Sequence, residues 1–307
     1  MAVVNTNISA SLAQASLAKN ERALSKAMEQ LSTGKKINTA ADDAAGLAIS
    51  SRMTSQIVGL EQSVQNAHDA ISMIQTAESA LDEMTNMLLR MRELALQASN
   101  GTGSVADRNY LQDEFGRLKA EIDRIANNTE WNGRAVLNGN AGGSGVTDVS
   151  YQVGGNAGQT ISVNFADMRG GGFAQSVSGG PTAASGGTAL SPSDAALSGL
   201  YPVSISGATT VEAQANASAA MTGIDLAIEN VSNQRASFGA AVNQLTHAID
   251  NLTQVSINAA STRSRIMDTD YAHATSELAK AQIIQQAGTA MLAQANQLPA
   301  SVLDLLG

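Results

Sequence analysis

The side chains best suited to chemistry are few and scattered in this 307-residue chain. Its three histidines, His68, His247 and His273, have no second metal ligand at a suitable spacing, so they do not predict a metal site. Asp42 and Asp43 are adjacent, and adjacent residues on a helix point in different directions rather than facing each other as an acid and a base. Both carboxylates suit the first turn of a helix, where they interact favourably with the helix dipole.

Motifs for covalent catalysis and phosphate binding are also absent from the sequence. The chain has no cysteine, which excludes disulfides and thiolate sites. The glycine clusters between residues 142 and 186 lack the Lys and Ser/Thr of a phosphate-binding loop. Met84, Met87 and Met91 recur at helical spacing, which indicates core residues rather than a metal or oxidation-sensing site. No nucleophile, base and orienting group can be assembled, so the sequence predicts a protein that is not an enzyme and uses no cofactor.

Composition favours a helical protein without nucleic-acid partners. Aromatic residues make up only 3% of the chain, and its apolar residues are mostly Ala, Leu, Ile, Val and Met, which suit helices. A formal net charge of −9 argues against nucleic acid, because phosphate binding needs clustered Lys and Arg. The N-terminus lacks the basic start and long apolar run of a secretory signal, and no uninterrupted apolar stretch predicts a membrane span.

Both ends of the chain carry a row of small and aliphatic residues at alternating steps of three and four. Such a row predicts a helix whose apolar stripe needs a partner helix. No neighbouring segment would cover either stripe, so we expect the two ends to cover each other and to contact other molecules. The N-terminal row is Ala10, Ala13, Leu17, Asn20, Leu24, Ala27 and Leu31, and the C-terminal row is Ala281, Ile284, Gly288, Met291, Ala295, Leu298, Val302 and Leu305. Asn20 is the polar member that could fix the register of the pair.

The same periodicity predicts three helices between the ends. One covers about residues 44–99, a shorter one contains Leu111 to Ile125, and a third contains Met221 to Ala259. Alternating residues predict a β-hairpin over residues 147–166, and residues 170–207 are rich in Gly, Ser and Thr, which indicates an irregular loop. We therefore expect a mainly α fold: a long antiparallel helical rod or coiled coil formed by both chain ends, with a small β-hairpin region and a short outer loop. Its expected core includes Ile57, Leu60, Val64, Ile71, Leu88, Phe115, Leu118, Ile228, Phe238 and Leu245.

Several separate runs, in the same order, resemble the bacterial flagellins. In the N-terminal part of the chain these are LSTGKKINTAADDAAGLAISSR (31–52), NAHDAISMIQTAESALDEM (66–84), RMRELALQASNGT (90–102) and EIDRIANNTEWNG (121–133). The C-terminal third contains NQRASFGAAVNQL (233–245) and AKAQIIQQAGTAMLAQANQLPASVLDLL (279–306). Thr33, Ser79, Leu89 and Trp131 stand where the family pattern leads us to expect Ser, Gly, Gln and Phe.

This resemblance implies a structural subunit that is exported unfolded and polymerises into the extracellular flagellar filament used for swimming, without a cleaved signal peptide. Residues 1–40 and 265–307 would form an inner tube of terminal coiled coils. Residues 41–169 and 208–264 would form an outer tube, and residues 170–207 a short variable surface loop. In the inner tube, the resemblance implies subunit packing through Leu17, Leu24, Leu31, Ile284, Met291, Leu298, Val302 and Leu305.

The resemblance also implies protein partners: further copies of the chain, an export chaperone, and the cap and hook-associated proteins. In flagellins that activate Toll-like receptor 5, the recognised patch corresponds here to Arg90, Leu94 and Glu114, beside the altered Leu89. Contacts between subunits are the alternative role for these residues. Two alternative functions remain open at this point: a hook–filament junction protein, which would match the central motifs less well, and a cell-surface module that binds a ligand through residues 170–207.

Overall fold

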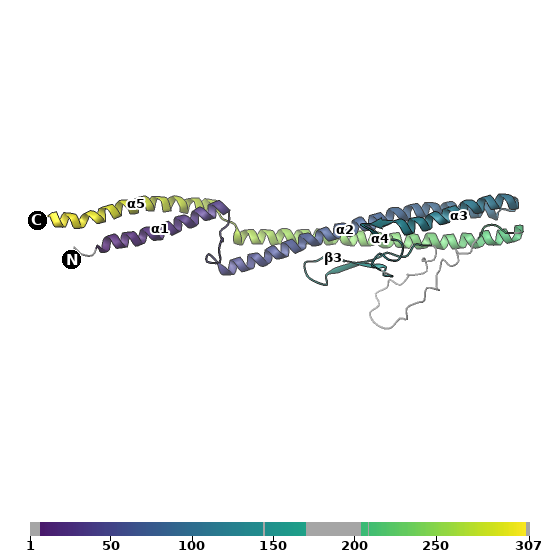
Figure 1. The fold of residues 1–307 in the computed structure, drawn as a ribbon, viewed down its shortest axis with the longest axis horizontal. Coiled ribbons are helices and arrows are strands. Elements are labelled where there is room, and N and C mark those ends of the chain that lie inside the picture. The colour runs from purple at the N-terminus through teal and green to yellow at the C-terminus, as the bar shows by residue number, and fades with distance from the viewer. Residues whose placement is uncertain (1–6, 144, 170–203, 208, 305–307) are drawn as a thin grey trace, which may run out of the picture. The chain divides into compact units, whose positions relative to one another are not determined.

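The structure is a computed structural model that describes residues 7–143, 145–169, 204–207 and 209–304. Within these residues it contains five helices and two small antiparallel hairpins (Figure 1). The helices are α1 (Ile8–Thr33), α2 (Ala44–Ser99), α3 (Val105–Asn128), α4 (Thr210–Met267) and α5 (Tyr271–Asp304). The strands are β1 (Glu130–Trp131) paired with β2 (Arg134–Ala135), and β3 (Asp148–Gln152) paired with β4 (Thr160–Asn164). The mainly α fold class is therefore confirmed.

Helix boundaries follow ordinary capping chemistry. Ser104 caps α3 by accepting a hydrogen bond from the backbone N–H of Asp107, whose carboxylate accepts one from the backbone N–H of Ser104. At the end of α1, Gly34 takes a left-handed conformation with φ of 69°, which glycine adopts without a steric penalty. Helix α2 occupies the predicted range of residues 44–99, because its apolar periodicity continues until the Asn100–Gly101 turn.

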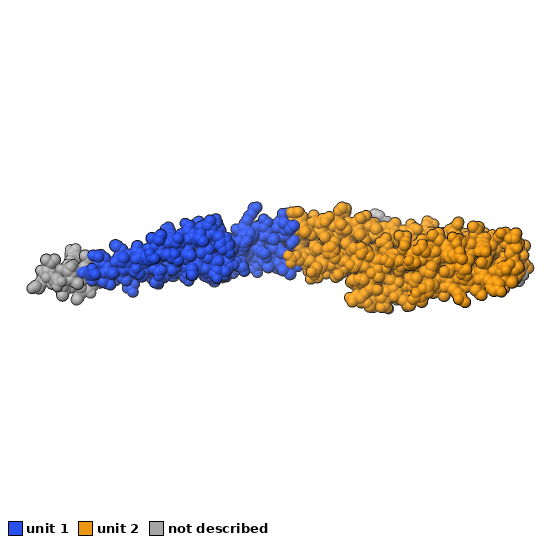
Figure 2. All heavy atoms as spheres, turned by 90° about the horizontal axis from the view of Figure 1, so that it is seen from above, with its two compact units in different colours: residues 1–58, 255–307 blue, residues 59–254 orange. Residues whose placement is uncertain are grey.

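The chain forms two compact units (Figure 2). The terminal unit comprises residues 1–58 and 255–307, and the central unit comprises residues 59–254. Helices α2 and α4 contribute to both units, since each crosses a boundary. In the terminal unit, α1 and α5 contact each other along their lengths in an antiparallel arrangement (Figure 1).

Two short connections in the terminal unit are tied to each other by backbone hydrogen bonds. The N–H of Lys36 donates to the carbonyl of Met267 over 2.6 Å, and the N–H of Thr269 donates to the carbonyl of Gly34 over 3.0 Å. Farther along the first connection, the Asp42 carboxylate pairs with Lys26 at 2.7 Å and also accepts from the backbone N–H of Thr39. The route of the chain between the helices is therefore specified by both backbone and side-chain bonds.

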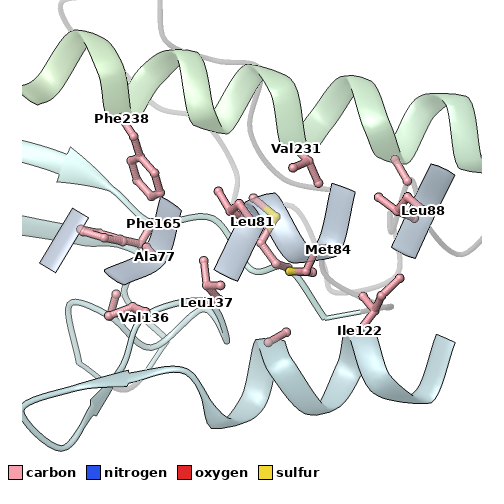
Figure 3. Close-up of a cluster of buried hydrophobic side chains, with 14 of the residues drawn as sticks. Ala77, Leu81, Met84, Leu88, Ile122, Val136, Leu137, Phe165, Val231 and Phe238 are labelled. Atoms are coloured by element: carbon pink, nitrogen blue, oxygen red, sulfur yellow. The ribbon is translucent and has the colours of Figure 1, made fainter. Parts of the chain in front are cut away.

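In the central unit, α2, α3 and α4 share one hydrophobic core (Figure 3). Leu81 and Leu88 come from α2, Ile122 from α3, and Val231 from α4. The fully or nearly fully buried row of α2 alternates steps of three and four without interruption: Ala67, Ala70, Ile74, Ala77, Leu81, Met84, Leu88, Met91, Ala95 and Ala98. This regular spacing keeps one face of α2 against its neighbours.

Amide side chains attach the β3–β4 hairpin to helices of the central unit. Asn66 of α2 donates to the carbonyl of Gln152 over 3.1 Å, and Gln234 of α4 donates to the carbonyl of Asn164 over 2.7 Å. The β1–β2 hairpin was not predicted from the sequence, although its Asn132–Gly133 turn is a recognised hairpin signal. Both turn residues have positive φ, as the tight turn requires.

The expected core residues are divided between two degrees of burial. Ile57, Leu88, Phe115, Phe238 and Leu245 are buried. The remaining five are partly buried: Leu60, Val64, Ile71, Leu118 and Ile228. Ile57 belongs to the terminal unit, whereas the other nine lie in the central unit.

Candidate assembly surface

Helix α5 faces α1 with a small residue at every seventh position: Ala281, Gly288 and Ala295. These small residues allow a close approach of the two helices. A Cβ atom placed on Gly288 would lie 3.2 Å from Cδ1 of Leu17, which is tighter than ordinary van der Waals contact. Gln285 and Leu292 are partly buried and complete the row that faces α1.

Two asparagine side chains, one within α1 and one just before it, donate hydrogen bonds to the backbone of α5. The Asn20 amide donates to the carbonyl of Ala281 over 2.7 Å, and the Asn7 amide donates to the carbonyl of Ala295 over 2.8 Å. Because Asn20 is buried, sliding the helices past each other would leave its amide without this acceptor. The bond gives a physical basis for the register role expected of Asn20. Leu24 and Leu31 are partly buried on α1.

A second row of apolar residues on α5 is left exposed. Ile284 is 44% exposed and Met291 is 65% exposed. They lie about 40–60° around the helix from the adjacent small residues, as follows from about 3.6 residues per turn. Their spacing in the sequence put them in one row with Ala281 and Gly288, whereas in the structure the small residues are covered and Ile284 and Met291 are exposed. The side chains of Leu298 and Val302, and the whole of Leu305, lie outside the described residues.

Exposed apolar side chains also occur elsewhere on α5 and on α1. Ile283 of α5, and Ile8 and Leu12 of α1, are more than half exposed. Exposed apolar residues gathered on neighbouring elements mark an interaction surface more often than scattered ones do. We call Ile284 and Met291 the exposed row of α5.

The proposed receptor patch of the central unit consists mainly of ion pairs. Arg90 of α2 pairs with Glu114 of α3 at 2.9 Å and with Glu93 at 3.0 Å. Hydrogen bonding to Glu114, more than to Glu93, raises the pKa of Arg90 above its ordinary value. All three side chains are exposed to solvent, so these pairs contribute little to stability.

Leu94 does not belong to the exposed part of that patch. Its side chain is only 1% exposed and lies in the core shared by the helices of the central unit. Its sequence neighbours Met91 and Ala95 are buried too, so this side of α2 faces inward. Leu89, by contrast, is 48% exposed beside Arg90. Arg90, Glu114 and Leu89 are therefore accessible within a single chain, whereas Leu94 is not.

Neither a metal centre nor a membrane helix emerges from the described part of the chain. Within it, no three His, Asp or Glu side chains gather in a way that could hold a metal ion. No described helix is both long enough and apolar enough to cross a membrane.

Comparison with known proteins identifies the family. The family model described as the bacterial flagellin N-terminal helical region matches residues 4–141, and the model of the bacterial flagellin C-terminal helical region matches residues 221–306. The chain is 42% identical to a flagellin of Bacillus subtilis and 37% identical to flagellin B of Vibrio cholerae, each over 99% of both chains. It also shares its fold with a putative flagellar hook-associated protein from Vibrio parahaemolyticus, with a TM-score of 0.59, 14% identity, and coverage of 74% of this chain and 100% of that one.

The chain therefore belongs to the bacterial flagellins, the structural proteins of the flagellar filament. Its function as a filament subunit, predicted from the sequence, is confirmed by this membership. The hook–filament junction alternative is not favoured, because the full-length relatives are flagellins and the hook-associated protein shares only the fold. The ligand-binding alternative depended on residues 170–207, most of which lie outside the described residues.

Proposed function

We propose that the terminal unit is the polymerisation element of this subunit, and that neighbouring copies cover the exposed row of α5. The observation that carries the proposal is the exposure of Ile284 and Met291 on a helix whose other face already contacts α1. In a single chain these side chains face water. In a helical array of identical chains each copy presents the same row to its neighbours, so the row can be covered.

Burial of these side chains between subunits is energetically favoured over their exposure to solvent. Burying one Ile or Met side chain stabilises a contact by about 1.5–3 kcal/mol. Small residues and two hydrogen bonds from asparagine side chains hold α5 close against α1. This contact fixes the direction in which Ile284 and Met291 point. Leu298, Val302 and Leu305 extend the exposed row in sequence, and we propose that they pack between subunits as well.

We propose the following roles for the other parts of the chain. Residues 1–40 and 265–307 would form the inner tube, residues 41–169 and 208–264 the outer tube, and residues 170–207 a short surface loop. Export of the unfolded chain without a cleaved signal is compatible with the lack of cysteine, since no disulfide has to form or break during passage. An export chaperone, cap proteins and hook-associated proteins would be its partners. The filament would serve swimming motility, and this role requires no catalytic step.

For the central unit, we propose that Arg90 and Glu114 form the accessible part of a Toll-like receptor 5 patch. The Arg90 Nη2 and Glu114 Oε1 atoms lie 2.9 Å apart, so the two helices place both charges side by side on the surface. The alternative, contact between subunits, would use the same exposed charges. A binding assay with the soluble subunit and the receptor ectodomain separates the two roles, because only receptor recognition predicts loss of binding on replacing Arg90 by Ala.

The polymerisation proposal is tested by placing a charge in the exposed row of α5. Met291→Glu would place an unpaired carboxylate in the subunit contact, which costs several kcal/mol, so we expect the critical concentration for assembly to rise at least tenfold. Gln286→Glu is the matched control, because it adds the same charge to an exposed position on another side of α5. We expect its critical concentration to stay within about twofold of the parent.

Assembly should be measured by pelleting and electron microscopy after seeding, with circular dichroism to show that both variants keep their helices. Normal assembly of Met291→Glu would overturn the proposal. Equal loss in both variants would mean that added charge, rather than the exposed row, is responsible.

A further inference from the structure

We propose that Met291 is a site of reversible oxidation by hydroperoxides, and that its oxidation state controls whether a subunit can enter the filament. The inference rests on the proposed role of the exposed row of α5 in assembly. It adds a chemical modification that this surface is suited to undergo.

The composition of the chain directs such an oxidant to methionine. Thiols are ordinarily the first side chains that peroxide attacks, and this chain has 11 methionines but no cysteine. Thioether sulfur is therefore its most readily oxidised group. Methionine sulfoxide can be reduced again by dedicated reductases, so the modification is reversible.

The structure then sorts the methionines by exposure. Met291 and Met28 are 65% and 55% exposed, and both lie in the terminal unit. Four methionines of the central unit have at most 1% of their surface exposed: Met73, Met84, Met91 and Met168. The sulfur of Met73 also accepts a hydrogen bond from the Tyr151 hydroxyl over 2.9 Å. Peroxide thus reaches the sulfur of Met291 without unfolding of the central unit.

The reaction is a two-electron oxygen transfer. The sulfur lone pair of Met291 attacks one oxygen of the hydroperoxide, and the O–O bond breaks. A sulfur–oxygen bond forms, and the second oxygen leaves as water or an alcohol after taking up the proton. The thioether is oxidised to a sulfoxide and the peroxide is reduced. Return to the thioether uses two thiol equivalents, which become a disulfide as the sulfoxide oxygen leaves as water.

Oxidation changes the chemistry of the exposed row at its most exposed described position. Met291 is flanked along the row by Ile284, one heptad away, and α5 is uncharged between Lys280 and its end at Asp304. A sulfoxide at this place introduces a strong hydrogen-bond acceptor that would have to lose its water when a neighbouring subunit covers it. Desolvating such a group without a partner corresponds to about a tenfold or greater rise in critical concentration.

The experiment uses the full-length subunit, brief treatment with dilute hydrogen peroxide, removal of the oxidant, and seeded assembly. Peptide mass spectrometry measures sulfoxide at each methionine. We expect Met291 and Met28 to be modified first, assembly to fall in proportion to sulfoxide at Met291, and treatment with sulfoxide reductases to restore it. Met291→Leu keeps an apolar side chain of similar volume and should assemble normally after the same treatment.

Met28→Leu is the matched control, because it removes the other methionine that is more than half exposed among the described residues and leaves Met291 in place. We expect it to remain sensitive to peroxide. Peroxide-resistant assembly of Met28→Leu, or unchanged sensitivity of Met291→Leu, would overturn the inference. So would full assembly of a parent protein that carries the sulfoxide at Met291.

Failure of the underlying assembly proposal has a different signature. If the exposed row is not a subunit contact, untreated Met291→Glu assembles normally, and Met291 inside finished filaments is oxidised as fast as in the free subunit. If Met291→Glu is blocked and Met291 is protected in filaments, yet the sulfoxide is tolerated, the assembly surface stands and only its control by oxidation is wrong.

Discussion

Replacing Phe238 by Ala should destabilise the central unit strongly. The side chain of Phe238 is fully buried, and its ring centroid lies 5.1 Å from that of Phe165 at an interplanar angle of 51° (Figure 3). Removing a buried phenyl ring costs about 3–5 kcal/mol, because apolar burial is lost and a cavity remains. About 0.5–1.5 kcal/mol of that loss would come from the aromatic pair itself.

The single tryptophan of the chain provides a selective assay. Trp131 lies in β1 and contacts the core of the central unit, so its fluorescence during urea unfolding reports on this unit. We expect the urea midpoint of Phe238→Ala to fall with little change in the slope of the transition, since the surface exposed on unfolding is nearly the same. Replacing both Phe165 and Phe238 by Ala should lower the free energy of unfolding by less than the sum of the two single effects, because the residues are in contact.

Gly239, next to Phe238, supplies a control replacement that should raise stability rather than lower it. A Cβ atom on Gly239 would meet no atom within 4 Å, and Gly239 lies within α4. Gly239→Ala should therefore raise stability by about 0.5–1 kcal/mol through a smaller loss of backbone entropy on folding. A loss below about 1 kcal/mol for Phe238→Ala would refute the reasoning, because it would mean that the site collapses around the missing ring at little cost.

Three further predictions concern single residues. Hydrogen bonds, first from Lys26 and then from the backbone of Thr39, hold the pKa of Asp42 well below its ordinary value, so its stabilising effect is present above about pH 4 and is lost as the pH falls through the lowered pKa. The hydrogen-exchange protection of the Thr39 amide, taken relative to its intrinsic exchange rate at each pH, should therefore fall in acid, and Asp42→Asn should show low protection already at neutral pH. Burial raises the pKa of Tyr151 to about 12, so stability is complete below its ordinary pKa of about 10 and is lost as the pH rises towards 12. In Tyr151→Phe, unfolding followed by Trp131 fluorescence should lose that alkaline dependence, and an unchanged dependence would exclude Tyr151 as its source. Gly46→Ala would place a Cβ atom 2.5 Å from Oδ2 of Asp43 and 2.6 Å from Cδ1 of Ile37, so the ends of both side chains must move and Asp43 loses the hydrogen bond that it accepts from the N–H of Gly46. Losing this bond at the start of α2 costs about 1 kcal/mol. Limited proteolysis between residues 34 and 43 should accelerate, and an unaltered cleavage rate would show that the connection absorbs the added methyl group.

Helix and hairpin positions could be predicted because they depend on local spacing. The steps of three and four from Met53 to Ala98 predicted a helix over residues 44–99, and α2 has these bounds. Alternation around Tyr151 and Val163 predicted the hairpin that the structure shows as β3 and β4. A period of 3.6 or of 2 is a property of the chain itself, so no tertiary information is needed to read it.

The side of each helix that turns inward was less predictable. Of positions 70 and 71, Ile71 was predicted to be the core residue, yet Ala70 is fully buried and Ile71 is only partly buried. Both positions fit the repeat, and the larger side chain appeared the better core residue. Close contact between the helices of the central unit instead favours alanine at the centre and places isoleucine at the margin.

Met291 illustrates the same limit at the assembly surface. The sequence by itself determined that α5 is helical, apolar and in need of partners, and its motifs determined the family. Only the tertiary structure decided that Ala281, Gly288 and Ala295 face α1 whereas Ile284 and Met291 face away. The physical reason is that small residues let Asn7 and Asn20 reach the backbone of α5, and this close approach fixes which side of the helix remains for other molecules.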